Sequence, residues 1–406
     1  MKGVFVIIDG SADLPCFQLN EKTPLEFAKT PNLDQIAFNS KIGYCFTVKE
    51  GVVPSSDTGV ISLFGYDYLN EKRGPLESAG LGLKLRNGDL AFRCNFATID
   101  NLEDGNILDR RAGRTLLTSE AKELAKTINE RVKLPFKFEF YSSVQHRGVL
   151  IIRGGFSDNI SGVESNQKDK LEWAKPLDEE DDSKLSAELV NSFVRQSNEL
   201  LDKHSVNVGR AKRGLYSANV ILCRGAGSEP LRLKKLRGKW IGLGYMPLEI
   251  GIMREIGIDV YRFKYPRLKS IDVYSNLYNG LNKAIKYAKR MLKWKRKKYD
   301  YFYIHFKEPD IPGHDNKPLE KVKMIEIIDQ KFFGFLKEYV GDGKLIVTAD
   351  HTTACKKKAH SSEPVPVLYY NGTELDDKEK KFSEVQGLKG KRISSRKLLE
   401  NYMFIK

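Results

Sequence analysis

A chain of 406 residues is longer than one hydrophobic core usually serves, so we expect two domains. Its composition, with 41% hydrophobic and 30% charged residues, excludes a disordered or low-complexity protein. The formal charge of +15 favours an acidic partner, such as nucleic acid, anionic lipid or a phosphorylated metabolite. No apolar run approaches the ~20 residues of a membrane span, and the five cysteines are scattered without a C-x-x-C pair. These features predict a soluble cytoplasmic protein without a disulfide framework or a thiolate zinc site.

Three apolar runs lead into an aspartate. The runs and their aspartates are residues 3–8 with Asp9, residues 300–306 with Asp310, and residues 344–349 with Asp350. Continuous apolar runs are typical of strands buried on both faces of a parallel sheet. Because ligands of open α/β sheets bind at the carboxyl ends of the strands, we expect these carboxylates to converge there.

Helix-like stretches alternate with strands, as in a mostly parallel sheet. The clearest helices span 275–298 and 318–339. The middle of the chain has shorter strands and helices of its own. It contains predicted strands at 90–99, 136–141, 148–152 and 218–223, predicted helices at 119–132 and 183–204, and a polar loop at 157–182. We therefore predict an α/β fold in which residues 1–88 and 228–406 form a mostly parallel sheet flanked by helices, and residues 89–227 form a smaller inserted α/β domain.

Carboxylates and imidazoles gather around the strand ends. The set comprises Asp9, Asp310, His314, Asp350, His351 and His360. Carboxylate oxygens and neutral imidazoles are ligands of Zn²⁺, Mn²⁺ and similar ions, and the set is large enough for two sites. The alternative is that each aspartate caps a helix or turn and each histidine is structural. Pro309, Pro312 and Gly313 predict a loop rather than a helical turn between Asp310 and His314.

Two further groups have candidate roles. An apolar stretch that suits a helix follows Ser55, Ser56, Asp57 and Thr58. A serine at the start of this helix is either a nucleophile or a helix cap. Basic residues lie at predicted turns in the middle of the chain. They are either ligands of a phosphate or carboxylate group or solvated surface charges. They are Arg110, Arg111, Arg114, Arg147 and Arg224, with His146 beside them. The lysine-rich part of helix 275–298 is expected to be a solvated face.

Several motifs together resemble those of the archaeal-type 2,3-bisphosphoglycerate-independent phosphoglycerate mutases, a family of the alkaline phosphatase superfamily. They are Phe5-Val-Ile-Ile-Asp9-Gly10, Ser56-Asp-Thr-Gly59, Glu308-Pro-Asp310-Ile-Pro-Gly-His314, Val347-Thr-Ala-Asp350-His351, Lys358-Ala-His360, Ala91-Phe-Arg-Cys-Asn95 and Asp109-Arg-Arg-Ala-Gly-Arg114. One departure is Val60, where many members carry a histidine. The resemblance implies an alkaline-phosphatase-like fold.

The resemblance also implies a ligand set and a nucleophile. One divalent cation (Mn²⁺, Zn²⁺, Co²⁺ or Mg²⁺) would be held by Asp9, Ser56, Asp350 and His351, and a second by Asp310, His314 and His360. Ser56 would be the phosphorylated nucleophile, with Ser55 as the alternative. The implied substrate-binding residues are Asp109, Arg110, Arg111, Arg114, His146, Arg147 and Arg224.

The expected reaction interconverts 3-phosphoglycerate and 2-phosphoglycerate through a phosphoserine, without 2,3-bisphosphoglycerate as cofactor. A small-molecule phosphoglycerate is the expected partner, rather than nucleic acid or a membrane. Two alternatives stay open: a metal-dependent phosphomonoesterase of the same superfamily, and a basic nucleic-acid-binding protein, for which the sequence contains no recognised motif.

Overall fold

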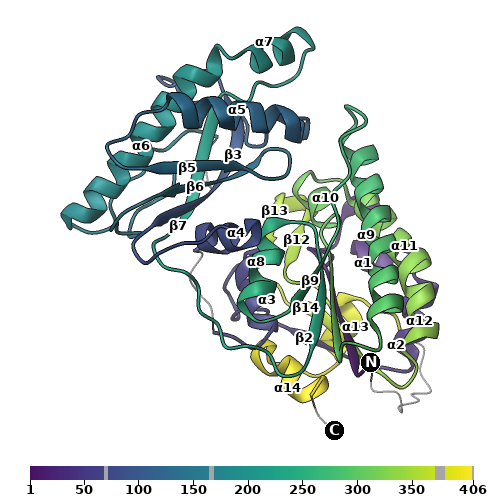
Figure 1. The fold of residues 1–406 in the computed structure, drawn as a ribbon. Coiled ribbons are helices and arrows are strands. Elements are labelled where there is room, and N and C mark those ends of the chain that lie inside the picture. Colours follow the sequence, from purple (N-terminus) through teal and green to yellow (C-terminus); the bar gives the residue numbers. More distant parts are fainter. Residues whose placement is uncertain (68–71, 164–168, 371–379, 405–406) are drawn as a thin grey trace.

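A computed structural model describes residues 1–67, 72–163, 169–370 and 380–404. The chain forms two lobes, each built around its own β-sheet (Figure 1). The larger lobe contains both ends of the chain. The smaller lobe, at the upper left of Figure 1, is formed by the middle of the sequence.

Within the described residues, seven strands form the larger sheet. In spatial order they are β2 (Lys41–Cys45), β14 (Val365–Tyr370), β11 (Lys344–Thr348), β1 (Gly3–Ile8), β10 (Tyr301–Phe306), β8 (Trp240–Gly244) and β9 (Asp259–Arg262). The five strands from β11 to β9 are parallel to one another, whereas β14 runs antiparallel to both β11 and β2. The sheet is therefore mixed but mostly parallel, as predicted.

Both faces of the larger sheet are covered, which explains the continuous apolar run of β1. Val4, Val6 and Ile8 pack into one core, and Phe5 and Ile7 pack into the core on the opposite face. The first core is completed by α1 (Pro24–Phe27), α2 (Pro31–Phe38), α9 (Val273–Lys295), α11 (Pro318–Ile328) and α12 (Gly334–Val340). The second is completed by α3 (Ser56–Leu63), α4 (Arg73–Leu81), α8 (Pro247–Glu255) and α14 (Leu398–Tyr402).

The smaller sheet is entirely antiparallel. Its strands are β3 (Leu90–Ile99), β4 (Ile107–Asp109), β5 (Phe138–Ser142), β6 (Arg147–Ile152) and β7 (Val220–Gly227). The central strand β3 pairs with β4, β6 and β7. Its helices are α5 (Thr118–Arg131), α6 (Asp181–Asp202) and α7 (Ser205–Lys212). Side chains of α5 and α6 pack with β3, β6 and β7 in a separate core.

Most predicted elements are confirmed to within a few residues, with two differences. The helix predicted at 318–339 contains a π-helical segment at Asp329–Phe333, between α11 and α12. Strand β7 continues through Arg224 to Gly227, four residues beyond the predicted end. Among the described residues, no helix is long and apolar enough to cross a membrane.

Candidate active site

Three neighbouring strands end at one edge of the larger sheet. β1 lies between β10 and β11, and Ile7 is paired with both His305 and Thr348. Asp9 directly follows β1 and Asp350 closely follows β11, and both side chains are fully buried. The strand order thus brings together carboxylates that are separated by more than 300 residues, as the sequence predicts.

A first cluster consists of Asp9, Ser56, Asp350 and His351. His351 Nε2 lies 3.5 Å from Asp9 Oδ1, 3.3 Å from Asp350 Oδ2 and 3.2 Å from Ser56 Oγ. The N–H of Gly10 donates to the other Asp350 oxygen at 3.1 Å. The other three predicted residues of this cluster therefore lie within 3.5 Å of His351 Nε2. The ligand atoms of His351 also lie within 4.8 Å of those of Asp310 and His360.

A second cluster consists of Asp310, His314 and His360. His314 Nε2 lies 3.3 Å from Asp310 Oδ2, and His360 Nε2 lies 3.7 Å from Asp310 Oδ1. The clusters are adjacent, because the rings of His351 and His360 stack with centroids 3.6 Å apart. His360 belongs to β13 (Ala359–Ser361), which forms a hairpin with β12 (Thr352–Ala354).

The predicted loop between Asp310 and His314 is wrong. These residues form the one-turn helix α10 (Asp310–His314). The prolines do not prevent this turn, because Pro309 is the N-cap and Pro312 lies in the first turn, where no intrahelical acceptor is needed for its missing N–H. The turn places both metal-ligand candidates on one side of the segment.

Three imidazoles are oriented by partners of their Nδ1 atoms. Nδ1 lies 3.1 Å from the Lys358 carbonyl in His314, 2.9 Å from the Pro54 carbonyl in His360 and 2.9 Å from Thr353 Oγ1 in His351. A carbonyl accepts only, so the first two rings carry a proton on Nδ1 and would bind a cation through Nε2. This orientation is typical of histidines that bind a metal through Nε2.

The charges in the two clusters are mutually dependent. Burial and the neighbouring Asp9 raise the pKa of Asp350 well above its ordinary value. Burial opposes ionisation of Asp310 too, but His314 and His360 outweigh it and hold the pKa of Asp310 well below its usual range. Burial lowers the pKa of His351, so this ring is neutral. Asp310 outweighs burial and raises the pKa of His314. Ligands bind a cation in their deprotonated forms, so a cation at these clusters would displace protons from Asp350 and His314.

Buried oxygens of the first cluster lack hydrogen bonds of normal geometry. They are both oxygens of Asp9 and Oδ2 of Asp350, although Lys307 Nζ also contacts Asp9 in an ion pair. A buried carboxylate without hydrogen bonds is costly, whereas oxygen and imidazole donors suit Zn²⁺, Mn²⁺, Co²⁺ or Mg²⁺. The residues of both clusters therefore fit divalent cations.

A third group of ligand-type side chains, Asp13, Cys16 and Cys355, has its candidate ligand atoms within 4.8 Å of one another. The Asp13 oxygens are already engaged, because Lys321 Nζ donates to Oδ2 at 2.7 Å and the N–H of Cys355 donates to Oδ1 at 3.0 Å. This group is therefore better explained as a buried structural ion pair.

Ser55 and Ser56 have different surroundings at the start of α3. Ser55 is the N-cap, and its hydroxyl donates to Asp57 Oδ1 at 2.7 Å. Ser56 is the first helical residue and lines the cavity beside His351. Val60, by contrast, is 1% exposed and packs in the core of the larger lobe.

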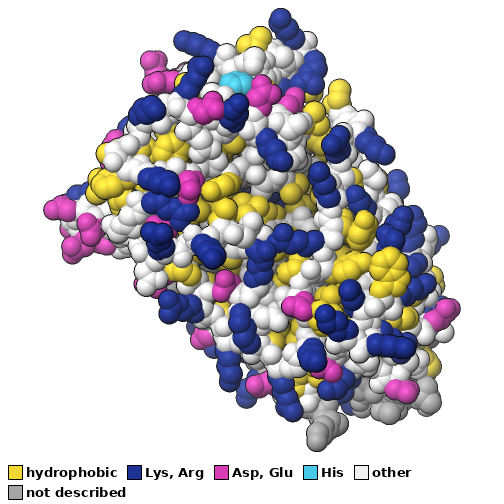
Figure 2. All heavy atoms as spheres, viewed as in Figure 1, with side chains coloured by type: hydrophobic (Ala, Val, Ile, Leu, Met, Phe, Trp, Pro, Cys, Tyr) yellow, Lys and Arg dark blue, Asp and Glu magenta, His cyan; other side chains and the backbone are white. Residues whose placement is uncertain are grey.

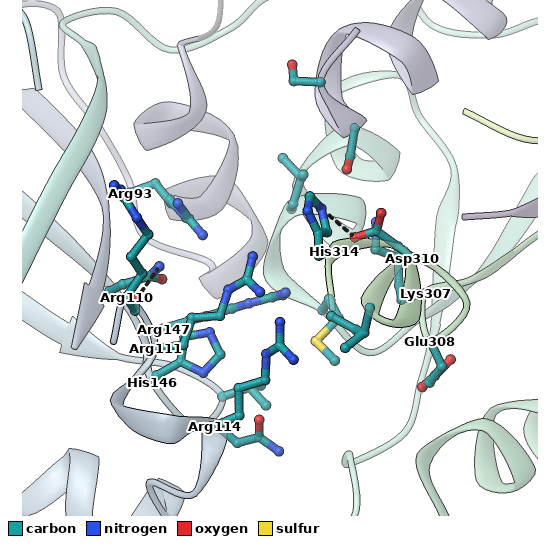
Figure 3. A pocket seen from close by; sticks show the side chains of 18 of the residues that line it. Arg93, Arg110, Arg111, Arg114, His146, Arg147, Lys307, Glu308, Asp310 and His314 are labelled. Atoms are coloured by element: carbon teal, nitrogen blue, oxygen red, sulfur yellow. Dashed lines mark hydrogen bonds and ion pairs between the residues drawn. The ribbon is translucent and has the colours of Figure 1, made fainter. Parts of the chain in front are cut away.

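A cavity of about 700 Å³ lies between the lobes and contains the accessible part of both clusters. Arginines of the smaller lobe face His314 and Asp310 across it (Figure 3). Those lining it are Arg93, Arg110, Arg111, Arg114, Arg147 and Arg224, and Arg73 of the larger lobe joins them. Such a concentration of guanidinium groups favours an anionic ligand with more than one charged group.

The arginine environments differ in detail. Burial and Arg114 lower the pKa of Arg111 to about 10, so Arg111 is still charged at neutral pH. Burial and Arg147 lower the pKa of His146 well below its ordinary value, so this ring is neutral. Arg114 bridges the lobes, because its Nη1 donates to Asp315 Oδ2 at 2.6 Å. A further hydrogen bond, from Tyr274 to Asp315, supports that contact.

Two predicted substrate-binding residues are placed differently from the expectation. Asp109 does not line the cavity, since its Oδ1 accepts from the N–H groups of Arg111 and Gly113 at 2.7 and 2.8 Å. It therefore shapes the arginine-bearing turn. Arg224 lies within β7 opposite Arg93 rather than at a turn, but it still reaches the cavity.

The sequence interpretation missed several cavity residues. They are Arg93, Lys307, Glu249, Glu308 and Tyr265. A usable signal was present for Arg93, which is the one charged residue of strand β3 and is only 6% exposed. Lys307 Nζ lies 2.9 Å from Glu249 Oε1 and also contacts Asp9. Burial lowers the pKa of Lys307, but Asp9 and Glu249 outweigh it and raise the pKa above its ordinary value.

Comparison with known proteins identifies the family of this chain. A relative from Thermococcus kodakarensis, a 2,3-bisphosphoglycerate-independent phosphoglycerate mutase, is 38% identical over 401 residues, covering 96% of this chain and 93% of the relative. The chain belongs to that mutase family. The family model "2,3-bisphosphoglycerate-independent phosphoglycerate mutase" matches residues 37–207, and the "Metalloenzyme superfamily" model matches residues 259–396. The protein is therefore an isomerase of the metalloenzyme superfamily, and the family resemblance seen in the sequence is confirmed.

Solved structures agree with this family. A Pyrococcus horikoshii protein is 30% identical with a TM-score of 0.76, covering 99% of this chain and 96% of its own. The cofactor-independent phosphoglycerate mutase from Thermoplasma acidophilum is 28% identical with a TM-score of 0.57, covering 99% of both chains. The mutase fold thus extends over both lobes of this chain.

Proposed function

We propose that the protein interconverts 3-phosphoglycerate and 2-phosphoglycerate through a phosphoserine at Ser56, with the two clusters holding two divalent cations. The observation that carries the proposal is the position of Ser56 Oγ, which faces His351 Nε2 at 3.2 Å in a cavity whose opposite wall is formed by arginines. In the forward direction Ser56 accepts the phosphoryl group from the 3-hydroxyl and returns it to the 2-hydroxyl of the retained glycerate.

Ser56 is better suited than Ser55 to accept the phosphoryl group. The Ser55 hydroxyl is engaged with Asp57 and Thr58 in the helix cap. The cations, when bound, would lower the pKa of the Ser56 hydroxyl and neutralise phosphate charge. Asp9, Asp350 and His351 would hold one cation, with Ser56 as the fourth ligand. The second cluster, Asp310, His314 and His360, would hold the other.

The arginines would hold the substrate while it is dephosphorylated. Glycerate released from its phosphate has only one charged group, so retaining it requires carboxylate contacts outside the cation clusters. Arg111 and Arg147 suit this task, since neither is neutralised by an ion pair within the described residues. A closed cavity would also exclude water, which otherwise competes with the glycerate hydroxyl for the phosphoryl group.

We further propose that residues 1–88 and 228–406 act as the phosphoryl-transfer domain and residues 89–227 as the substrate-binding domain. The contact between Arg114 and Asp315 joins the two parts and supports this division of roles. Asp315 directly follows the candidate ligand His314, so the bridge lies next to the second cluster.

The test is conversion of 3-phosphoglycerate by the purified, cation-loaded enzyme without 2,3-bisphosphoglycerate. We expect 2-phosphoglycerate with little free phosphate, loss of activity in Ser56→Ala and measurable activity in Ser55→Ala. Stoichiometric phosphate release would favour the phosphomonoesterase alternative. Wild-type activity of Ser56→Ala, or dependence on the bisphosphate, would overturn the proposed mechanism.

A further inference from the structure

His305 is a buried polar residue in an otherwise apolar strand. Side chains of β10 alternate between the two cores of the larger lobe, and Tyr301 and Tyr303 lie on the same face as His305. His305 is 1% exposed. A histidine at such a position requires partners for both ring nitrogens, because an unpaired buried polar atom is costly.

Only one of those nitrogens has a hydrogen bond of normal geometry. Nδ1 lies 2.9 Å from the hydroxyl of Tyr303. Nε2 faces carboxylate oxygens, 3.0 Å from Asp9 Oδ2 and 3.6 Å from Asp350 Oδ2, without a hydrogen bond of normal geometry. The candidate ligand atoms of Asp9, His305 and Asp350 all lie within 4.8 Å of one another.

These unsatisfied atoms share one point of convergence. Both oxygens of Asp9, Oδ2 of Asp350 and Nε2 of His305 lack normal hydrogen bonds, and all belong to the ends of three adjacent strands. A single cation among them would satisfy all four atoms at once. Protonation of His305 would satisfy these atoms less well. Lys307 already contacts Asp9, and its positive charge would repel an imidazolium at His305.

We propose that His305 is a further ligand of the cation held by Asp9 and Asp350, an inference that rests on the two-cation site of the proposed function. In this arrangement Nδ1–H donates to the Tyr303 hydroxyl oxygen and the Nε2 lone pair binds the cation. No redox change is involved. Tyr303 is then a positioning residue that fixes the ring, as partners of metal-bound histidines usually do.

The additional ligand has a consequence for metal preference. Asp9, Ser56, Asp350, His351 and His305 would supply five protein ligands. Zn²⁺ is usually four-coordinate, whereas Mn²⁺ accepts larger coordination numbers. This site is therefore expected to prefer Mn²⁺ over Zn²⁺ more strongly than the second cluster, which has three protein ligands.

The test is proton NMR of the full-length protein loaded with two equivalents of Co²⁺. Each imidazole bound to Co²⁺ through Nε2 gives one strongly shifted, exchangeable Nδ1–H resonance. We expect four such resonances in the wild type, from His305, His314, His351 and His360, and three in His305→Gln. Titration of that variant should show ~10–100-fold weaker Co²⁺ binding at one of the two sites.

A matched control is His204→Gln, which removes a histidine at the N-cap of α7 whose Nδ1 accepts from Val206 N–H. This variant should retain four resonances and both affinities. Three resonances in the wild type with two Co²⁺ bound would overturn the role of His305 and leave the two-cation proposal intact. Failure to bind two equivalents would overturn both. The wild-type count decides the question even if His305→Gln does not fold.

Discussion

Thr353→Val is expected to weaken both of the proposed cation sites by removing a single hydroxyl. Thr353 is fully buried, and its Oγ1 lies 2.9 Å from His351 Nδ1 and donates to Asp310 Oδ1 at 2.8 Å. It is thus hydrogen-bonded to one residue of each cluster. Valine has nearly the same shape, and it would fill the same space against Gly313, whose backbone approaches the Thr353 side chain closely. The fold is therefore expected to be retained.

The size of the effect follows from the two lost hydrogen bonds. The bond to the Asp310 carboxylate is worth ~1.5–3 kcal/mol and the bond to the neutral His351 ring ~0.5–1.5 kcal/mol. Because both ligands would lose their orientation, we expect ~10–100-fold weaker binding at each site, the range typical of lost partners of metal ligands. Calorimetric titration of the metal-stripped protein with Mn²⁺ measures both affinities directly.

The neighbouring residue provides the control. The Thr352 hydroxyl donates to the carbonyl of Glu363 at 3.1 Å, away from the clusters, so Thr352→Val should keep both affinities. Wild-type Mn²⁺ binding by Thr353→Val would refute the reasoning. Loss at only one site would show that the hydroxyl orients one ligand and not both.

Two further predictions concern the substrate and stability. Arg111→Ala should lower kcat/KM ~10–100-fold through loss of one charge-assisted contact. The control Arg213→Ala removes an exposed partner of Glu120 and should leave kcat/KM unchanged. Equal kcat/KM values for the two variants would contradict the role of Arg111. Burial raises the pKa of Glu384 from 4.5 to about 7. The folded state thus binds the extra proton, and stability falls as pH rises through this window. In urea titrations at pH 5 and pH 8, Glu384→Gln should reduce the difference between the two free energies of unfolding by at most roughly 3 kcal/mol. An unchanged difference would refute this prediction.

The parts of the site that could be predicted are those encoded in contiguous segments. A buried strand followed by an aspartate reports both the element and the edge at which its carboxylate lies, so Asp9 and Asp350 were predictable. The helical turn at α10 was not, because proline has opposite effects in the first turn and in a helix interior. The contacts of Asp109 were not predictable either, because the sequence does not show that its carboxylate accepts from the backbone of its own turn.

Other features depend on strand order, which a single sequence does not determine. His305 meets Asp9 only because β10 pairs with β1 in the register that places Ile7 opposite it. The contact between Arg114 and Asp315 joins residues that are 201 positions apart. Lys307 was a charged residue after a strand, and nothing in its neighbourhood indicated that Asp9 and Glu249 would surround it.

The net charge of the protein has two distinct contributions. Lysines and arginines are spread across the face shown in Figure 2 and do not form one continuous stripe there. The arginines that line the cavity, in contrast, are concentrated opposite the carboxylates of the clusters. Such an arrangement suits a small anion better than an extended polyanion, because the charge is directed inward. In the proposed reaction this separation has a chemical purpose: the clusters act on the phosphoryl group, and the arginines retain the glycerate whose hydroxyl must receive it back before water does.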